Sequence, residues 1–167
     1  FNPADEEQEK FALLDEIVTK SARLNGVKPT GDIVTMLLKK RFLSSPYAFG
    51  TTLSRYLASN ASRGLSDDEY DDIFGAGQSD EEEGLWEQDE SERLRDSKGS
   101  DPLVGAEPGQ LATLANWGLG YESRADSRLT ALIAFLDSVC RPDGELWTNE
   151  RVVVFTEYAD TVEWLAR

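Results

Sequence analysis

The chain has no histidine, one cysteine and one methionine among its 167 residues. A single cysteine, Cys140, excludes a disulfide framework within the chain. Without histidine, no Ser-His-Asp or Cys-His catalytic arrangement can form, and a structural zinc site is not expected. The chemistry left to this sequence is that of carboxylates, hydroxyls and a small number of cations.

The chain also lacks long apolar runs and nucleotide-binding motifs. No apolar stretch approaches the roughly 18–20 residues that cross a bilayer, and no basic and apolar leader is present. We therefore expect a soluble, cytoplasmic protein with no membrane partner. Neither G-x-x-x-x-G-K-[ST] nor G-x-G-x-x-G occurs, and the acidic run 67–72 lacks the glycine of a calcium-binding loop. We expect no catalytic residue, metal or cofactor in this stretch of sequence.

Charge is dominated by one sign, with 32 acidic against 17 basic residues and a net charge of −15. Residues 63–101 hold 15 acidic and 4 basic residues, a net charge of −11. By contrast, residues 1–62 carry +1 and residues 102–167 carry −5. The acidic stretch is typical of a solvated, mobile insert. The net charge therefore does not exclude nucleic-acid contact by the first 62 residues.

Apolar residues at helical spacing predict a mainly α fold. We expect a helical region at 1–62, the acidic insert at 63–101, a second helical region at 102–148, and a strand and helix at 149–167. Ser45 is expected to cap a helix whose first residue is Pro46. The predicted helices begin near Asp5, Thr30, Ser45, Pro108 and Asp126.

Residues 151–156, with the sequence RVVVFT, are the exception to the helical pattern. Such a continuous apolar run is typical of a strand that is covered on both faces in a parallel sheet. Val162, Leu165 and Ala166 then follow at helical spacing, so we expect a β-α unit. The sequence holds no second convincing strand. We expect its partners to lie beyond this sequence, in an incomplete α/β lobe, or in another copy of the chain.

The only basic cluster is Lys39, Lys40 and Arg41. Ser44 and Ser45 follow it and can donate hydrogen bonds to phosphate oxygens. The alternative interpretation is a solvated helix face with cations near a helix C-terminus.

Three stretches of the sequence resemble a known family. DSRLTALIAFL from Asp126 and ERVVVFTEYADTVEWL from Glu150 are similar to the start of the second RecA-like lobe of superfamily-two helicases. The narrower resemblance is to bacterial Swi/Snf-type ATPases. LLKKRFLSSPYAFGTTL from Leu37 resembles the helical region between the two lobes of these proteins. The similar stretches cover residues 30–58 and 126–167.

The resemblance implies that the chain is a fragment of an ATP-dependent motor that acts on double-stranded DNA. ATP and Mg²⁺ would be bound by parts of the parent helicase before Phe1 and after Arg167, so the fragment alone would have no ATPase activity. Its role would be to couple the lobes and contact DNA. The end of the predicted strand adds Thr156 and Tyr158 as further candidates for DNA contact. The candidate DNA-binding residues are Lys39, Lys40, Arg41, Ser44, Ser45, Thr156 and Tyr158.

Two other functions fit parts of the sequence. The acidic residues 63–101 could belong to an interaction module that mimics DNA or binds a basic partner. A hydrolase using two carboxylates is a further alternative, although no spacing places two acids in one pocket.

Overall fold

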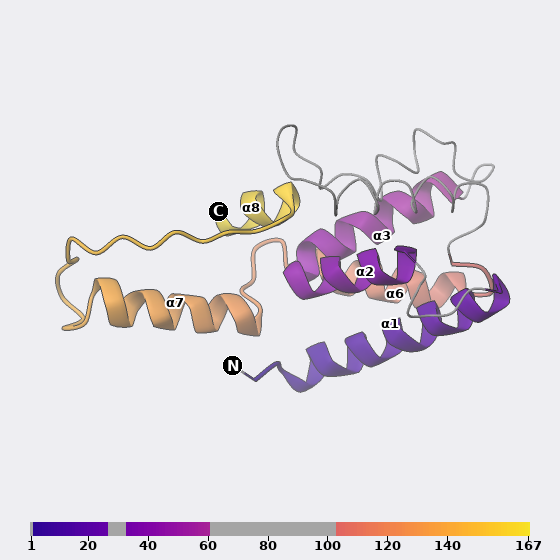
Figure 1. Ribbon diagram of the computed structural model, residues 1–167, viewed down its shortest axis with the longest axis horizontal. Helices are drawn as coiled ribbons and strands as arrows, with labels where there is room; N and C mark the ends of the chain where they lie inside the picture. Colours follow the sequence, from indigo (N-terminus) through magenta and orange to yellow (C-terminus); the bar gives the residue numbers. More distant parts are fainter. Residues whose placement is uncertain (1, 27–32, 61–102) are drawn as a thin grey trace.

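The computed structural model describes residues 2–26, 33–60 and 103–167 (Figure 1). This part of the chain is mainly helical, as predicted, and the acidic stretch 63–101 lies outside it. The helices are α1 (Asp5–Leu24), α2 (Ile33–Ser44), α3 (Pro46–Asn60), α6 (Pro108–Leu119), α7 (Ser127–Cys140) and α8 (Ala159–Leu165). None of the helices in these ranges is both long enough and apolar enough to cross a membrane.

Helices α1, α2, α3 and α6 pack around one apolar core (Figure 1). The ring of Phe42 is central to it, because its centroid lies 5.3 Å from that of Phe11, 5.1 Å from Phe49 and 5.2 Å from Trp117. Aromatic contacts of this kind add to the free energy gained from burying apolar area. The buried members of the core are Leu14, Ile17, Val18, Leu37, Leu38, Phe42, Phe49, Leu53, Tyr56, Leu103, Leu111, Leu114 and Ala115.

A local capping arrangement ends α2 and begins α3. The Ser45 side chain accepts a hydrogen bond of 3.0 Å from the backbone amide of Ala48, and Pro46 is the first residue of α3. Proline suits this position because its missing N–H would have no partner within the helix. The predicted Ser45–Pro46 helix start is confirmed.

Helices α3 and α6 touch through their backbones at two glycines. A Cβ atom placed on Gly118 would lie 2.4 Å from the carbonyl oxygen of Pro46, and one on Gly50 would lie 2.5 Å from the amide nitrogen of Leu119. These distances leave no room for a methyl group on either residue. Glycine is therefore required at both positions by the close approach of the two helices.

Glu7 joins the beginning of α1 to the beginning of α7. Its carboxylate accepts hydrogen bonds from the Ala4 amide at 3.1 Å and the Ser127 amide at 2.9 Å, and from the Ser127 hydroxyl. Burial raises the pKa of Glu7, but the bonds from Ser127 and Ala4 outweigh it, so the net shift is downward. The carboxylate is therefore charged in the fold, where it holds the start of α7.

Helix α7 and residues 150–157 project together from the helical core (Figure 1). The predicted strand at 151–156 is not assigned, and these residues run as an extended segment with no strand beside them in the described part of the chain. The reason is physical, since a strand requires a hydrogen-bonding neighbour. The helix that was predicted to follow is present as α8.

We predict that Gly118→Ala lowers the free energy of unfolding by about 1–3 kcal/mol, because the added methyl must displace backbone atoms of α3. Gly109→Ala in the same helix is the matched control, since a Cβ there meets no atom within 4 Å. Urea unfolding of both variants checks the difference. Equal stability of the two would contradict the close helix contact.

We predict that Glu7→Gln lowers the stability at neutral pH by about 1–2 kcal/mol, because it weakens charge-assisted hydrogen bonds. A lowered folded-state pKa stabilises the fold above the ordinary pKa of 4.5, and this contribution is lost as the pH falls through the folded value. The variant and the wild type should therefore converge in melting temperature in acid. Glu9→Gln, at an exposed position of α1, is the control and should show no such convergence.

Candidate nucleic-acid interface

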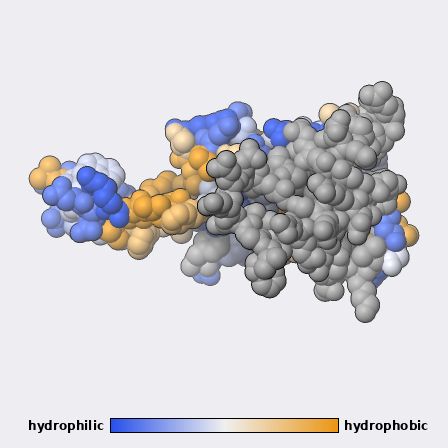
Figure 2. Space-filling view, turned by 45° about the horizontal axis from the view of Figure 1, so that its top comes forward, coloured by the Kyte–Doolittle hydropathy of each residue, from blue (hydrophilic) through white to orange (hydrophobic). Residues whose placement is uncertain are grey.

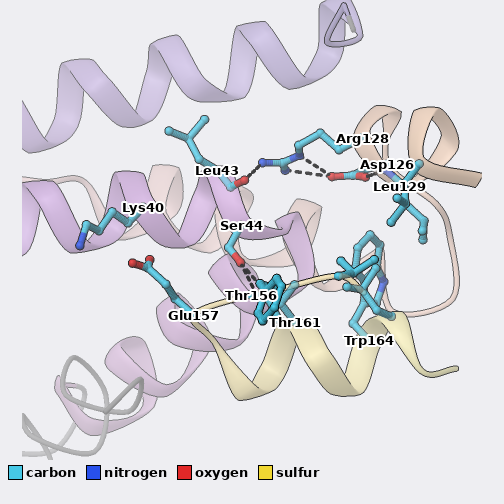
Figure 3. Close-up of a pocket in the computed structure, with 14 residues that line it drawn as sticks. Lys40, Leu43, Ser44, Asp126, Arg128, Leu129, Thr156, Glu157, Thr161 and Trp164 are labelled. Carbon is cyan, nitrogen blue, oxygen red and sulfur yellow. Dashed lines mark hydrogen bonds and ion pairs between the residues drawn. The ribbon is translucent and has the colours of Figure 1, made fainter. Parts of the chain in front are cut away.

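Three segments meet at the C-terminal end of α2, where they surround a pocket of about 480 Å³ (Figure 3). The pocket lies between α2, the first half of α7, residues 154–157 and α8. One side of the lining, called the polar rim below, carries Lys40, Ser44, Thr156 and Glu157, and the rest of the lining includes apolar side chains of α7 and α8. The lining residues are Lys40, Leu43, Ser44, Asp126, Arg128, Leu129, Leu132, Val154, Phe155, Thr156, Glu157, Thr161, Trp164 and Leu165.

Three hydroxyl groups, those of Ser44, Thr156 and Thr161, line one side of this pocket, and the buried Ser45 hydroxyl lies next to them. The Oγ of Ser44 lies 2.8 Å from Oγ1 of Thr161 and 3.5 Å from Oγ1 of Thr156. The Oγ of Ser45 lies 3.1 Å from the same Thr161 oxygen (Figure 3 shows Ser44, Thr156 and Thr161). Because each hydroxyl can both donate and accept, the cluster can reorient toward an anionic oxygen.

Arg41 of α2 is 1% exposed. Its guanidinium carbon is 4.7 Å from the ring centroid of Tyr158, and its Nη1 is 3.6 Å from Oδ2 of Asp160. Burial lowers the pKa of Arg41, Tyr158 and Asp160 raise it, and the charge of Arg55 lowers it. The net shift is downward, but an arginine remains charged at neutral pH. Arg41 thus connects α2 to the start of α8 from inside the protein.

The two lysines of the basic cluster face different parts of the structure. Lys39 forms an ion pair with the exposed Asp15 of α1, so its charge faces that helix. Lys40 lines the pocket, on the same side as Glu157 (Figure 3). Neighbouring helix positions differ by about 100° around the axis, which separates the two side chains.

The structure thus brings together six of the seven residues predicted to bind nucleic acid. Ser44, Ser45 and Thr156 are in the hydroxyl cluster, Lys40 is on the pocket rim, and Arg41 and Tyr158 form the buried stack beside it. We call the meeting point of α2, α7, residues 154–157 and α8 the junction. The remaining residue, Lys39, is not part of it.

Asp126 and Arg128 form a second connection at the junction that the sequence analysis did not assign. The Asp126 carboxylate caps α7 by accepting a hydrogen bond of 2.7 Å from the Leu129 amide, and it accepts another of 2.9 Å from Nε of Arg128. The Arg128 guanidinium also donates to the carbonyl oxygens of Phe42, at 3.0 Å, and Leu43. Asp before an apolar helix is a recognisable capping signal. The carbonyl partners of Arg128, on Phe42 and Leu43, are more than 80 positions away, and no local pattern predicts them.

Arg55 of α3 is a further cation near the junction. It is exposed, and its charge is close enough to lower the pKa of Arg41. Together with the basic cluster it makes the described part of α2 and α3 a stretch with four cations and no acidic residue.

No protein-family model matches the chain, and the comparisons with curated proteins and with solved structures also found no match. The residues of this chain must therefore carry the functional argument by themselves.

We predict that Arg128→Ala lowers the free energy of unfolding by about 1–3 kcal/mol, because two carbonyl oxygens and the Asp126 carboxylate lose a charged donor. Arg151→Ala is the control with the same change of charge, since the exposed Arg151 contacts only the neighbouring backbone oxygens of Asn149 and Glu150 in the described structure. Thermal and urea unfolding measure both variants. A loss of stability for Arg128→Ala no larger than that of the control would contradict the connection that Arg128 makes between α7 and the end of α2.

Proposed function

We propose that the chain is the helical coupling region and the first β-α unit of the second RecA-like lobe of a Swi/Snf-type, ATP-dependent DNA translocase. The observation that carries this proposal is the junction. The stretch from Leu37 and the stretch from Glu150 each resemble this family, and Ser44 and Thr161, one from each stretch, lie 2.8 Å apart across 117 positions. A junction between these stretches is what a lobe-coupling region requires.

The extended segment 151–156 supports the second part of the proposal. Val153 is 73% exposed and Phe155 is 91% exposed, and Val152 and Val154 are 37% and 46% exposed. The projecting part of the molecule accordingly presents a band of apolar surface (Figure 2). Apolar residues exposed on both faces of an extended segment suit the interior of a parallel sheet. We assign that sheet to the remainder of the lobe, with a second copy of the chain as the alternative partner.

The rim of the pocket has the chemistry of a phosphate contact. The Lys40 ammonium supplies charge, and the hydroxyls of Ser44 and Thr156 supply hydrogen-bond donors, which are common partners of DNA phosphates. Thr156 ends the proposed strand, and ligands of parallel sheets bind at the carboxyl ends of strands. In this proposal double-stranded DNA binds at the rim, while Arg55 extends the positive surface along α3.

The residues described do not fit a site for Mg²⁺ and ATP. Of the two pocket carboxylates, Asp126 is engaged by the Leu129 amide and by Arg128. Glu157 then remains as a single carboxylate, and no group of three metal-ligating side chains occurs in the described part of the chain. The proposal therefore assigns ATP binding and hydrolysis to other parts of the parent helicase and derives no catalytic step here.

We predict that Lys40→Ala weakens binding of this chain to duplex DNA and reduces the slope of log K against log salt by about one, because one phosphate contact is lost. Lys39→Ala is the matched control, since it removes the same charge from a lysine that faces Asp15 and does not line the pocket. Fluorescence anisotropy with a duplex of about 20 base pairs, titrated upward from about 50 mM salt, measures the slope.

Equal slopes for the two variants would contradict the assignment of Lys40, and no duplex binding by the wild type at low salt would overturn the DNA-contact role. ATP turnover by the purified chain would contradict the placement of the nucleotide site elsewhere.

A further inference from the structure

The contact between Arg41 and the start of α8 has an unusual geometry for a DNA-binding arginine. Arg41 is 1% exposed and Tyr158 is 5% exposed, so neither side chain offers its polar atoms to a phosphate from outside. The guanidinium instead lies over the Tyr158 ring at 4.7 Å and beside Asp160 at 3.6 Å. Both partners are at the N-terminal end of α8, and Tyr158 is the residue that precedes its first turn.

This contact determines where the extended segment can lie. Thr156 is two residues before Tyr158, and the Tyr158 amide is 3.4 Å from the Thr156 hydroxyl oxygen. Fixing Tyr158 on Arg41 therefore limits the position of Thr156, which reaches Ser44 at 3.5 Å. One buried arginine thus connects the position of α2 to the polar rim of the pocket.

We propose that Arg41 is a positioning residue: it fixes the start of α8 through Tyr158 and Asp160, and so sets Thr156 beside Ser44, without contacting DNA itself. The effect on DNA binding rests on the function proposed above, whereas the effect on α8 does not. This inference separates Arg41 and Tyr158 from the phosphate-contacting residues with which the sequence grouped them.

The stacked geometry requires arginine and an aromatic ring. A planar guanidinium can lie over a ring face while its charge faces a carboxylate beside the ring, which no other side chain does at once. The rest of α8 is held by other contacts, because Trp164 Nε1 donates to the Tyr121 carbonyl at 2.7 Å and Thr161 bonds to Ser45. Loss of the stack should therefore loosen the start of α8 without unfolding the core.

Hydrogen exchange of the α8 amides tests the positioning role directly. In Arg41→Met and in Tyr158→Leu, the amides of Thr161 and Val162, which bond to the Tyr158 carbonyl, should exchange roughly fivefold faster or more relative to core amides of α3, a size typical of contacting side chains. The double variant should lose little beyond either single change. Tyr158→Phe keeps the ring over Arg41 and should therefore exchange more slowly at these amides than Tyr158→Leu. Arg141→Met is the matched control, because Arg141 also lies over an aromatic ring, that of Trp147, and beside Asp137.

Duplex binding distinguishes positioning from contact. If Arg41 positions the site, Arg41→Met weakens binding but leaves the salt slope unchanged, because no phosphate contact is removed. A slope reduced by about one, as for Lys40→Ala, would overturn the proposal and make Arg41 a direct contact. Tyr158→Phe also distinguishes positioning from direct contact with DNA. The change removes any contact through the phenol hydroxyl but keeps the ring over Arg41.

The two proposals fail in different experiments. Wild-type exchange rates in Arg41→Met, or additive losses in the double variant, would overturn the positioning role whatever the chain does with DNA. Should Arg41→Met perturb the core as well, Asp160→Asn provides the second variant, because Asp160 is partly exposed and the change removes its charge beside Arg41. Absence of duplex binding by the wild type would remove the DNA-contact function and leave the exchange experiment to decide the role of Arg41.

Discussion

The last turn of α2 ends in carbonyl groups that take hydrogen-bond donors from a distant part of the chain, and these contacts determine where α7 and α8 join the helical core. Arg128 supplies two of the donors, to Phe42 and Leu43, from the first turn of α7. The next hydroxyl, on Ser44, bonds to Thr161 of α8. Helix ends without partners are costly when they are shielded from water. The end of α2 is therefore where three segments that are distant in sequence are joined.

Much of the helical core follows from patterns within the sequence. The start of α3 at Ser45–Pro46 and the cap of α7 at Asp126 are local signals, and they depend on side chains one to three residues away. The apolar spacing of Leu14, Ile17 and Val18 likewise predicts the buried face of α1. In each of these cases, the interaction that determines the structure lies within one turn of a helix.

The candidate site was only partly predictable, because its contacts are long-range. Composition groups Lys39, Lys40 and Arg41 together, yet the fold sends them to Asp15, to the pocket and to Tyr158 respectively. The different surroundings of these three side chains depend on which face of α2 meets α1 and which face meets α8. No pattern within the local sequence predicts this. The apolar segment 151–156 shows the opposite case: its composition favours a strand, but pairing depends on a neighbour that the described residues do not contain.

The close contact between α3 and α6 has a consequence for the chain that connects them. Residues 61–107 leave α3 and return to α6, and the glycine contact at Gly50 and Gly118 holds the two helices in backbone contact. The distance between the two ends of the connection is therefore the same whatever the length of the connection. Doubling the length of a loop costs only about 0.6 kcal/mol of closure entropy. The acidic stretch 63–101 can therefore be lengthened, shortened or given another charge while the junction at the end of α2 keeps its geometry.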